Sequence, residues 1–103
     1  MIARIWSARS SRENATRYLD HFERAVAPAL SRLDGYVDAT VLQRHDANTT
    51  HITVVTRWRA IEAVQRFAGA DIGAAVVDDE AAAVLTDWDR RVQHYEVAFE
   101  HSR

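Results

Sequence analysis

The sequence has no cysteine, one proline and three glycines, and it lacks a long apolar run. Without cysteine the chain cannot form disulfides, thiolate metal sites or iron–sulfur clusters, and it has no cysteine nucleophile. This usage fits a reducing compartment, and we expect a cytoplasmic location. No stretch approaches the roughly 20 apolar residues of a membrane helix. Because charges interrupt the short N-terminal apolar stretch, we do not expect a signal peptide.

Charge of one sign is also not in excess. The chain has 13 basic and 15 acidic residues, and its net charge is −2. Proteins that bind nucleic acid or anionic membranes usually carry a basic patch, so we expect neither partner. Hydrophobic residues make up 48% and charged residues 27%, which is ordinary for globular proteins. At this length we expect a single domain over residues 1–103.

The first third of the chain predicts a strand followed by a helix. Ile2–Ala8 alternates between two different sets of side chains, which is typical of a strand. Ser10 then begins a capping-box pattern, and apolar residues recur every three or four positions up to Leu33. We expect Pro28 to kink this helix near its end and Gly35 to terminate it.

The remaining segments predict a hairpin, further helix and a last strand. Their ranges are Tyr36–His45 and His51–Arg59 for the hairpin, Ala60–Ala68, Asp71–Val77 and Asp78–Thr86 for helical turns, and Arg91–Phe99 for the strand. We interpret the acidic residues Asp78–Glu80 as the start of a helix. The order strand, helix, strand, strand, helix, strand predicts a ferredoxin-like α+β fold, with helices on one face of a four-stranded antiparallel sheet.

The uncovered face of this sheet is the first candidate for function. We expect it to carry one set of alternating side chains, namely Ile2, Arg4, Trp6, Ile52, Val54, Thr56, Trp58, His94 and Glu96. Such a surface is too apolar for a solvated sheet and too polar for a plain core, which is typical of an interface or a ligand site. We therefore expect a homodimer in which two sheets face each other and enclose a pocket.

Three stretches carry a family resemblance: MIARIW at residues 1–6, WRAIEAVQRFAGADIGAAV at residues 58–76 and VQHYEV at residues 92–97. Through them the chain resembles the antibiotic biosynthesis monooxygenase (ABM) domain of the dimeric α+β barrel superfamily, from Ile2 to Phe99. The resemblance implies a homodimer whose two sheets form the barrel, with a small-molecule pocket between sheet and helices.

The best-known members of that family oxidise phenolic or quinol-like polycyclic substrates with molecular oxygen and without a cofactor. The resemblance therefore implies a small aromatic or hydrophobic ligand and no metal or flavin. Trp6 and Trp58 would stack on the ring, and Thr56 and Glu96 would line the same site. Arg4 would stabilise the substrate anion, and His94 would take the proton.

A second branch of the family degrades haem. Its motif combines an asparagine on the first strand, a tryptophan at the end of the third and a haem-ligating histidine in the second helical segment. Trp58 matches the tryptophan, but Trp6 stands at the asparagine position and Val76 or Val77 at the histidine position. We therefore do not expect haem degradation by that route.

Other interpretations of the same residues stay open. Trp6 and Trp58 are also suited to packing, Arg4 to an ion pair with Glu96 or with a carboxylate of a partner subunit, and His94 to a hydrogen-bonded core position. The alternative functions are a non-catalytic ligand-binding or stress-related barrel and a purely structural dimer. The other histidines lack metal-ligand spacing, so we predict no metal site.

Overall fold

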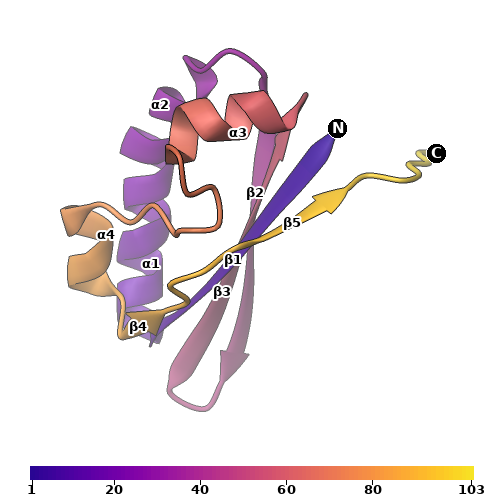
Figure 1. Ribbon diagram of the computed structural model, residues 1–103. Helices are drawn as coiled ribbons and strands as arrows, with labels where there is room; N and C mark the ends of the chain where they lie inside the picture. Colours follow the sequence, from indigo (N-terminus) through magenta and orange to yellow (C-terminus); the bar gives the residue numbers. More distant parts are fainter.

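An open antiparallel sheet with helices on one side forms the structure, a computed structural model that describes residues 1–103 (Figure 1). The strand order is β2-β3-β1, and both β4 and β5 pair with the other edge of β1. The elements are β1 (Ile2–Ser11), α1 (Arg12–His21), η1 (Phe22–Val26), α2 (Ala27–Ser31), β2 (Tyr36–Asp46), β3 (Thr49–Trp58), α3 (Ile61–Ala68), α4 (Asp79–Val84), β4 (Asp87–Trp88) and β5 (Gln93–Glu96). The predicted ferredoxin-like α+β fold is confirmed. None of the helices is long and apolar enough to span a membrane.

The first helical segment runs through α1, η1 and α2 along the sheet (Figure 1). Its N-cap is Ser11, whose hydroxyl accepts a hydrogen bond from the Asn14 amide, so the prediction of Ser10 was one residue too early. Strand β1 continues through Ser10, which is buried. The distortion predicted at Pro28 takes the form of the π-helical turn η1, immediately before the short helix α2 that holds the proline in its first turn.

The second half of the chain has less regular structure than its pattern suggested. Helix α4 begins at the predicted acidic run, and the Asp78 side chain caps it by accepting from the Ala81 amide. The predicted helical turn at Asp71–Val77 is wrong, because this segment forms turns and a single bridge between Ala74 and Arg91. Strand β5 is shorter than the predicted Arg91–Phe99 and pairs with the N-terminal part of β1.

The prediction of which sheet face lies uncovered is wrong. In β3 the residues at alternate positions from Thr50 to Trp58 are at most 7% exposed, because they lie beneath the helices. Their cross-strand neighbours Arg4 and Trp6 lie on the same side. Burial of the larger apolar side chains contributes more stabilisation than burial of the small set on the opposite face, so this face packs against the helices.

Of the predicted set, His94 and Glu96 lie near the margin of that face. Their strand β5 forms the sheet edge beside β1, where His94 is half-buried and Glu96 is exposed. The predicted chamber between two tryptophan-bearing faces therefore does not form, since Trp58 is fully buried within one chain and Trp6 is half-buried against the same core.

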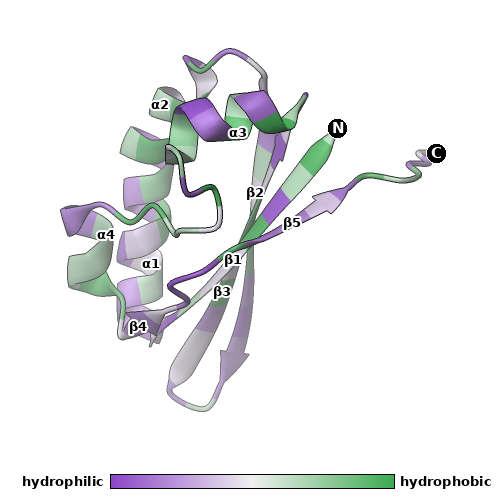
Figure 2. Ribbon diagram, in the orientation of Figure 1, coloured by the Kyte–Doolittle hydropathy of each residue, from purple (hydrophilic) through white to green (hydrophobic).

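The open face carries the other alternating set instead. Ile5 and Val55 lie opposite each other in the centre of the sheet, with Thr40 beside Val55 and Gln93 beside Ile5. The β2–β3 hairpin extends past the helices and is largely hydrophilic there, as is β5, whereas hydrophobic residues gather on α2 and the start of β1 (Figure 2). The uncovered surface is thus mixed, with its apolar part near the middle of the strands.

Trp58 is the centre of the core. Its side chain is fully buried, and its ring stacks on Phe67 at 5.3 Å and meets Tyr36 edge-on at 5.5 Å. Its indole nitrogen donates to the Thr56 hydroxyl at 2.9 Å, so the one polar atom of the ring is also satisfied. These contacts join the ends of β2 and β3 to α3.

We predict that Gly35→Ala destabilises the fold more than Gly69→Ala does. Both glycines have positive φ, 87° and 85°, but a Cβ at Gly35 would lie 2.5 Å from the Ala63 Cβ, whereas Gly69 has open space around it. The clash should cost about 1–3 kcal/mol beyond the shared backbone strain. Urea unfolding of both variants measures this difference, and equal midpoints would contradict the close approach.

Candidate functional site

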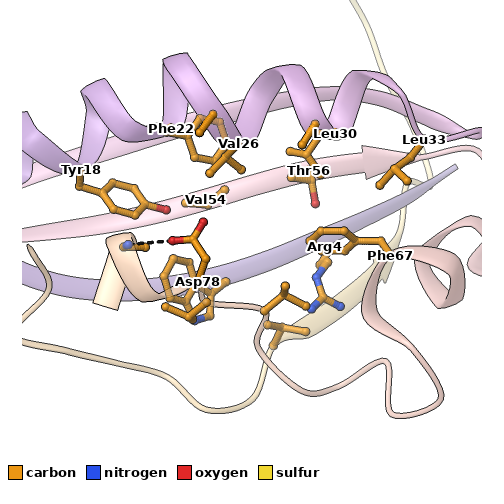
Figure 3. Close-up of a pocket in the computed structure, with 17 residues that line it drawn as sticks. Arg4, Tyr18, Phe22, Val26, Leu30, Leu33, Val54, Thr56, Phe67 and Asp78 are labelled. Carbon is orange, nitrogen blue, oxygen red and sulfur yellow. Dashed lines mark hydrogen bonds between the residues drawn. The ribbon is translucent and has the colours of Figure 1, made fainter. Parts of the chain in front are cut away.

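A cavity of about 320 Å³ lies between the sheet and the helices, and 14 of its 17 lining residues are hydrophobic (Figure 3). Strands β1 and β3 form its floor, and the α1–η1–α2 segment forms one long wall. The remaining lining residues are Leu33, Phe67 of α3, the segment Val76–Asp78, Ala81 of α4 and Val92. The volume is near the lower end of the range for small-molecule sites.

Arg4 is the cationic group of this cavity. It is 4% exposed, and one terminal nitrogen donates to the Ile72 carbonyl at 2.6 Å and to His94 Nε2 at 2.9 Å. The other donates to the Ala74 carbonyl at 2.8 Å, and the guanidinium lies 5.5 Å from the centre of the Phe67 ring. Two of its five N–H groups make no hydrogen bond within the protein.

No carboxylate neutralises this arginine within the chain. The predicted ion pair with Glu96 is wrong, because Glu96 lies opposite Ile2 at the sheet edge and is exposed. Burial lowers the pKa of Arg4 to about 10, so the group is still a cation at neutral pH. A buried cation held only by neutral acceptors has a strong capacity to bind an anionic or carbonyl oxygen.

His94 lies behind Arg4 and does not line the cavity. Because a guanidinium has only donors, the Nε2 atom of His94 must accept from it. Burial and, secondarily, the charge of Arg4 lower the pKa of His94. The folded chain therefore binds this proton less readily than the unfolded chain, and stability falls as the pH drops below the ordinary histidine value. In this geometry His94 orients Arg4.

The other predicted site residues divide into two groups. Trp6 and Thr56 line the cavity, and the Trp6 indole donates to the Asp89 carbonyl at 2.8 Å. Trp58 does not reach the cavity, but it supports Thr56 and Phe67, which do. Glu96 lies outside it.

Tyr18 and Asp78 lie at the end of the cavity away from Arg4 (Figure 3). Tyr18 is 4% exposed, and burial, followed by the charge of Asp78, raises the pKa of its hydroxyl. Both Asp78 carboxylate oxygens lie within 3.0 Å of Nε2 of His21, a buried residue of α1. None of the histidines and carboxylates forms a group of three or more suited to hold a metal ion.

Sequence reasoning missed this second end of the cavity. Tyr18 belongs to the apolar stripe of a helix, and Asp78 is a helix cap. Local structure therefore already explains why a tyrosine and an aspartate occur at these positions. The sequence did contain one signal. His21 lies beside the apolar stripe of the helix, at a position where an apolar or a fully exposed residue is expected. Its partner lies 57 positions away, which periodicity does not reveal.

Comparisons with known proteins agree with this fold. A sequence model described as "Antibiotic biosynthesis monooxygenase" matches residues 1–79. Among solved structures, a Bacillus cereus protein assigned to the antibiotic biosynthesis monooxygenases is similar with a TM-score of 0.71 and 14% identity, over 99% of this chain and 97% of that one.

Two further structures are similar at TM-scores of 0.64 and 0.62. The first is the heme-degrader MhuD from Mycobacterium tuberculosis with two hemes bound, 20% identical over 99% of this chain and 100% of that one. The second, from Deinococcus radiodurans and also assigned to the antibiotic biosynthesis monooxygenases, is 17% identical over 100% of this chain and 98% of that one. No curated protein sequence matches the chain. At these identities the structures show a shared fold.

We predict that Arg4→Met raises the pKa of His94. The change removes the adjacent cation and the hydrogen bond to Nε2, and both favour the neutral ring. Titration of the histidine ring protons by NMR measures the shift, with the His94 signal assigned from a His94→Gln spectrum. Arg44→Met, on the exposed part of β2, is the control and should leave His94 unchanged. An unchanged pKa in Arg4→Met would contradict the contact.

Proposed function

Because the chain belongs to the antibiotic biosynthesis monooxygenase family, we propose that it binds a small, flat aromatic molecule in the helix–sheet cavity and oxidises it with molecular oxygen, without a metal or flavin. The observation that carries the proposal is an apolar cavity containing a buried arginine with no carboxylate partner. The apolar walls suit a ring system, and Arg4 suits an oxygen atom of that ring.

The chemistry needs three things from the protein. It must hold the substrate, stabilise the anion that forms when the substrate loses a proton, and exclude water. Trp6 and Phe67 offer aromatic surfaces, and the free N–H groups of Arg4 offer hydrogen bonds to the developing anion. Anthrone is a suitable probe, since anthrone and oxygen give anthraquinone and water, and the substrate itself supplies all the electrons.

The cavity does not fit haem as a cofactor. Its lining contains no histidine, and His94 is engaged with Arg4 through Nε2. Tyr18 is the one tyrosine of the lining, and its raised pKa disfavours the phenolate that binds iron. Val76 and Val77 line the cavity where the haem-degrading branch has its histidine. We therefore assign no step to haem.

We further propose that the functional form is a homodimer joined through the open sheet face. Ile5 and Val55 provide the apolar centre of that face, with Tyr95 exposed nearby on β5. Pairing two such faces would cover the sheet side that the helices leave bare. The single domain over residues 1–103 and the cytoplasmic location also stay predictions.

We predict that anthrone quenches the tryptophan fluorescence of the protein and is consumed together with oxygen. Ala29→Phe should weaken binding at least about tenfold, because Ala29 lines the cavity and a phenyl group would occupy it. Ala83→Phe is the matched control, since Ala83 is exposed on α4 and lies outside the cavity. Fluorescence titration and an oxygen electrode give the two measurements.

The two readouts separate the candidate functions. Binding with no oxygen uptake above the rate without protein would indicate a ligand-binding protein that does not catalyse this oxidation. Equal loss of binding in Ala29→Phe and Ala83→Phe would contradict the assignment of this cavity as the site.

We predict that Val55→Arg converts a dimer into a monomer. Val55 lies in the middle of the open face between Ile5 and Thr40, and a buried, unpaired arginine there would oppose association. Sedimentation at micromolar concentration should give twice 11.7 kDa for the unmodified chain and 11.7 kDa for the variant. Ala83→Arg should remain dimeric. A monomeric unmodified chain would refute the dimer.

A further inference from the structure

We propose that Asp78 is the proton acceptor of the cavity, that His21 positions it, and that Arg4 at the opposite end receives the negative charge. The inference rests on the proposed function, since it specifies how a bound aromatic molecule would lose its proton. It moves the acid–base role from His94, which lies outside the cavity, to a carboxylate that lines it. It also requires a ligand that has an acidic hydrogen at one end and an oxygen atom at the other.

Asp78 is the best base among the groups that line the cavity. Arg4 and the Trp6 indole have only donors, and the hydroxyls of Tyr18 and Thr56 are very weak bases. The Asp78 side chain is 53% exposed, so it contacts both the cavity and solvent. A proton taken from a ligand therefore has a route out of the site through the exposed part of the same carboxylate.

Two donors hold Asp78 in place. Its Oδ1 accepts from the Ala81 amide at 2.8 Å, and its two oxygens lie 3.0 and 2.9 Å from His21 Nε2. The other ring nitrogen of His21, Nδ1, contacts a Glu80 oxygen. Because an ionised carboxylate only accepts hydrogen bonds, Nε2 of His21 is the atom that donates to Asp78.

The surrounding charges are few. Glu80 also lies 3.8 Å from Arg24, and Arg24 pairs with Asp20 at 2.7 Å on the outer surface of the same helical segment. Tyr18 is the other titratable group that faces Asp78; its hydroxyl is uncharged at neutral pH, as an ordinary tyrosine is, and burial raises its pKa further. His21 is therefore the one titratable side chain that makes a hydrogen bond to the carboxylate.

Tyr18 gives independent support for a ligand at this end. It is 4% exposed, and its hydroxyl makes no hydrogen bond within the protein. Figure 3 shows this hydroxyl and the Asp78 carboxylate pointing toward one another across the cavity end. The hydroxyl of this otherwise buried side chain opens onto the cavity, where it is available to a polar ligand atom.

The two ends fit a conjugated ketone or phenol that has its acidic hydrogen on one edge and an oxygen on the other. The C–H or O–H bond at the Asp78 end breaks, and a new O–H bond forms on the carboxylate. The electron pair moves through the conjugated rings to the oxygen that faces Arg4, where two free N–H groups are available. A carboxylate base opposite hydrogen-bond donors to the anion is a known arrangement for enolisation.

Exchange of the C10 hydrogens of anthrone for deuterium, in D2O without oxygen, tests this step apart from oxidation. Asp78→Asn should lower the protein-catalysed exchange rate roughly 10²–10⁴-fold. Binding, followed by tryptophan fluorescence, should change less than about threefold, since asparagine keeps the helix cap. Asp79→Asn is the matched control, because Asp79 is the next residue, is exposed and lies outside the cavity.

A second variant tests the positioning role. His21→Ala removes the donor to Asp78 and should slow the exchange without weakening anthrone binding, whereas His21→Gln retains an N–H donor and should restore much of the rate. Equal rates in His21→Ala and the unmodified protein, or a loss of binding that matches the loss of rate, would contradict the positioning role.

The outcomes separate the two proposals. If the unmodified protein binds anthrone and Asp78→Asn exchanges it equally fast, the role of Asp78 is refuted and the proposed function stands. If the unmodified protein does not bind anthrone, the proposed function fails, and the inference about Asp78 fails with it.

Discussion

The guanidinium of Arg4 is the interaction on which the site depends. It lies on the central strand, and its donors reach the Ile72 and Ala74 carbonyls, so it fixes the irregular segment between α3 and α4 against the sheet. This segment forms little regular structure of its own. The two hydrogen bonds from Arg4 therefore do much to hold it against the cavity. The same cation gives one end of the cavity its positive charge, while the Asp78 carboxylate lines the other end, and no carboxylate of the chain pairs with Arg4.

The cavity exists because the helices do not pack tightly onto all of the sheet. The long helical segment passes over β1 and β3 with small residues, Ala25 and Ala29, facing the gap. At one end Trp58 and Phe67 fill the space between helix and sheet, and at the other His21 ties α1 to the residues that begin α4. Packing is thus dense at the ends and open in the middle, which leaves room for a ligand without exposing the core.

Much of the fold followed from local pattern. Alternation identified β1, β2 and β3, and the spacing of apolar residues identified the first helix and α3. Tyr18, Asp78 and His21 were missed as site residues because each has an ordinary local explanation, and only the pairing of distant segments brings them together. Alternation in the sequence placed Arg4, Trp6 and Thr56 on one face of the sheet. In the structure these three residues do line one cavity, but it lies beneath the helices.

The sequence by itself determined which side chains share a face, because alternation along a strand depends only on the backbone. It did not determine which of the two faces the helices cover, since that depends on the total apolar area that each face can bury. Tertiary structure decided that question in favour of the face with Ile52, Val54 and Trp58. It also decided the charge environment of the cavity, because the partners of Arg4 and His21 are 57 to 90 positions away along the chain.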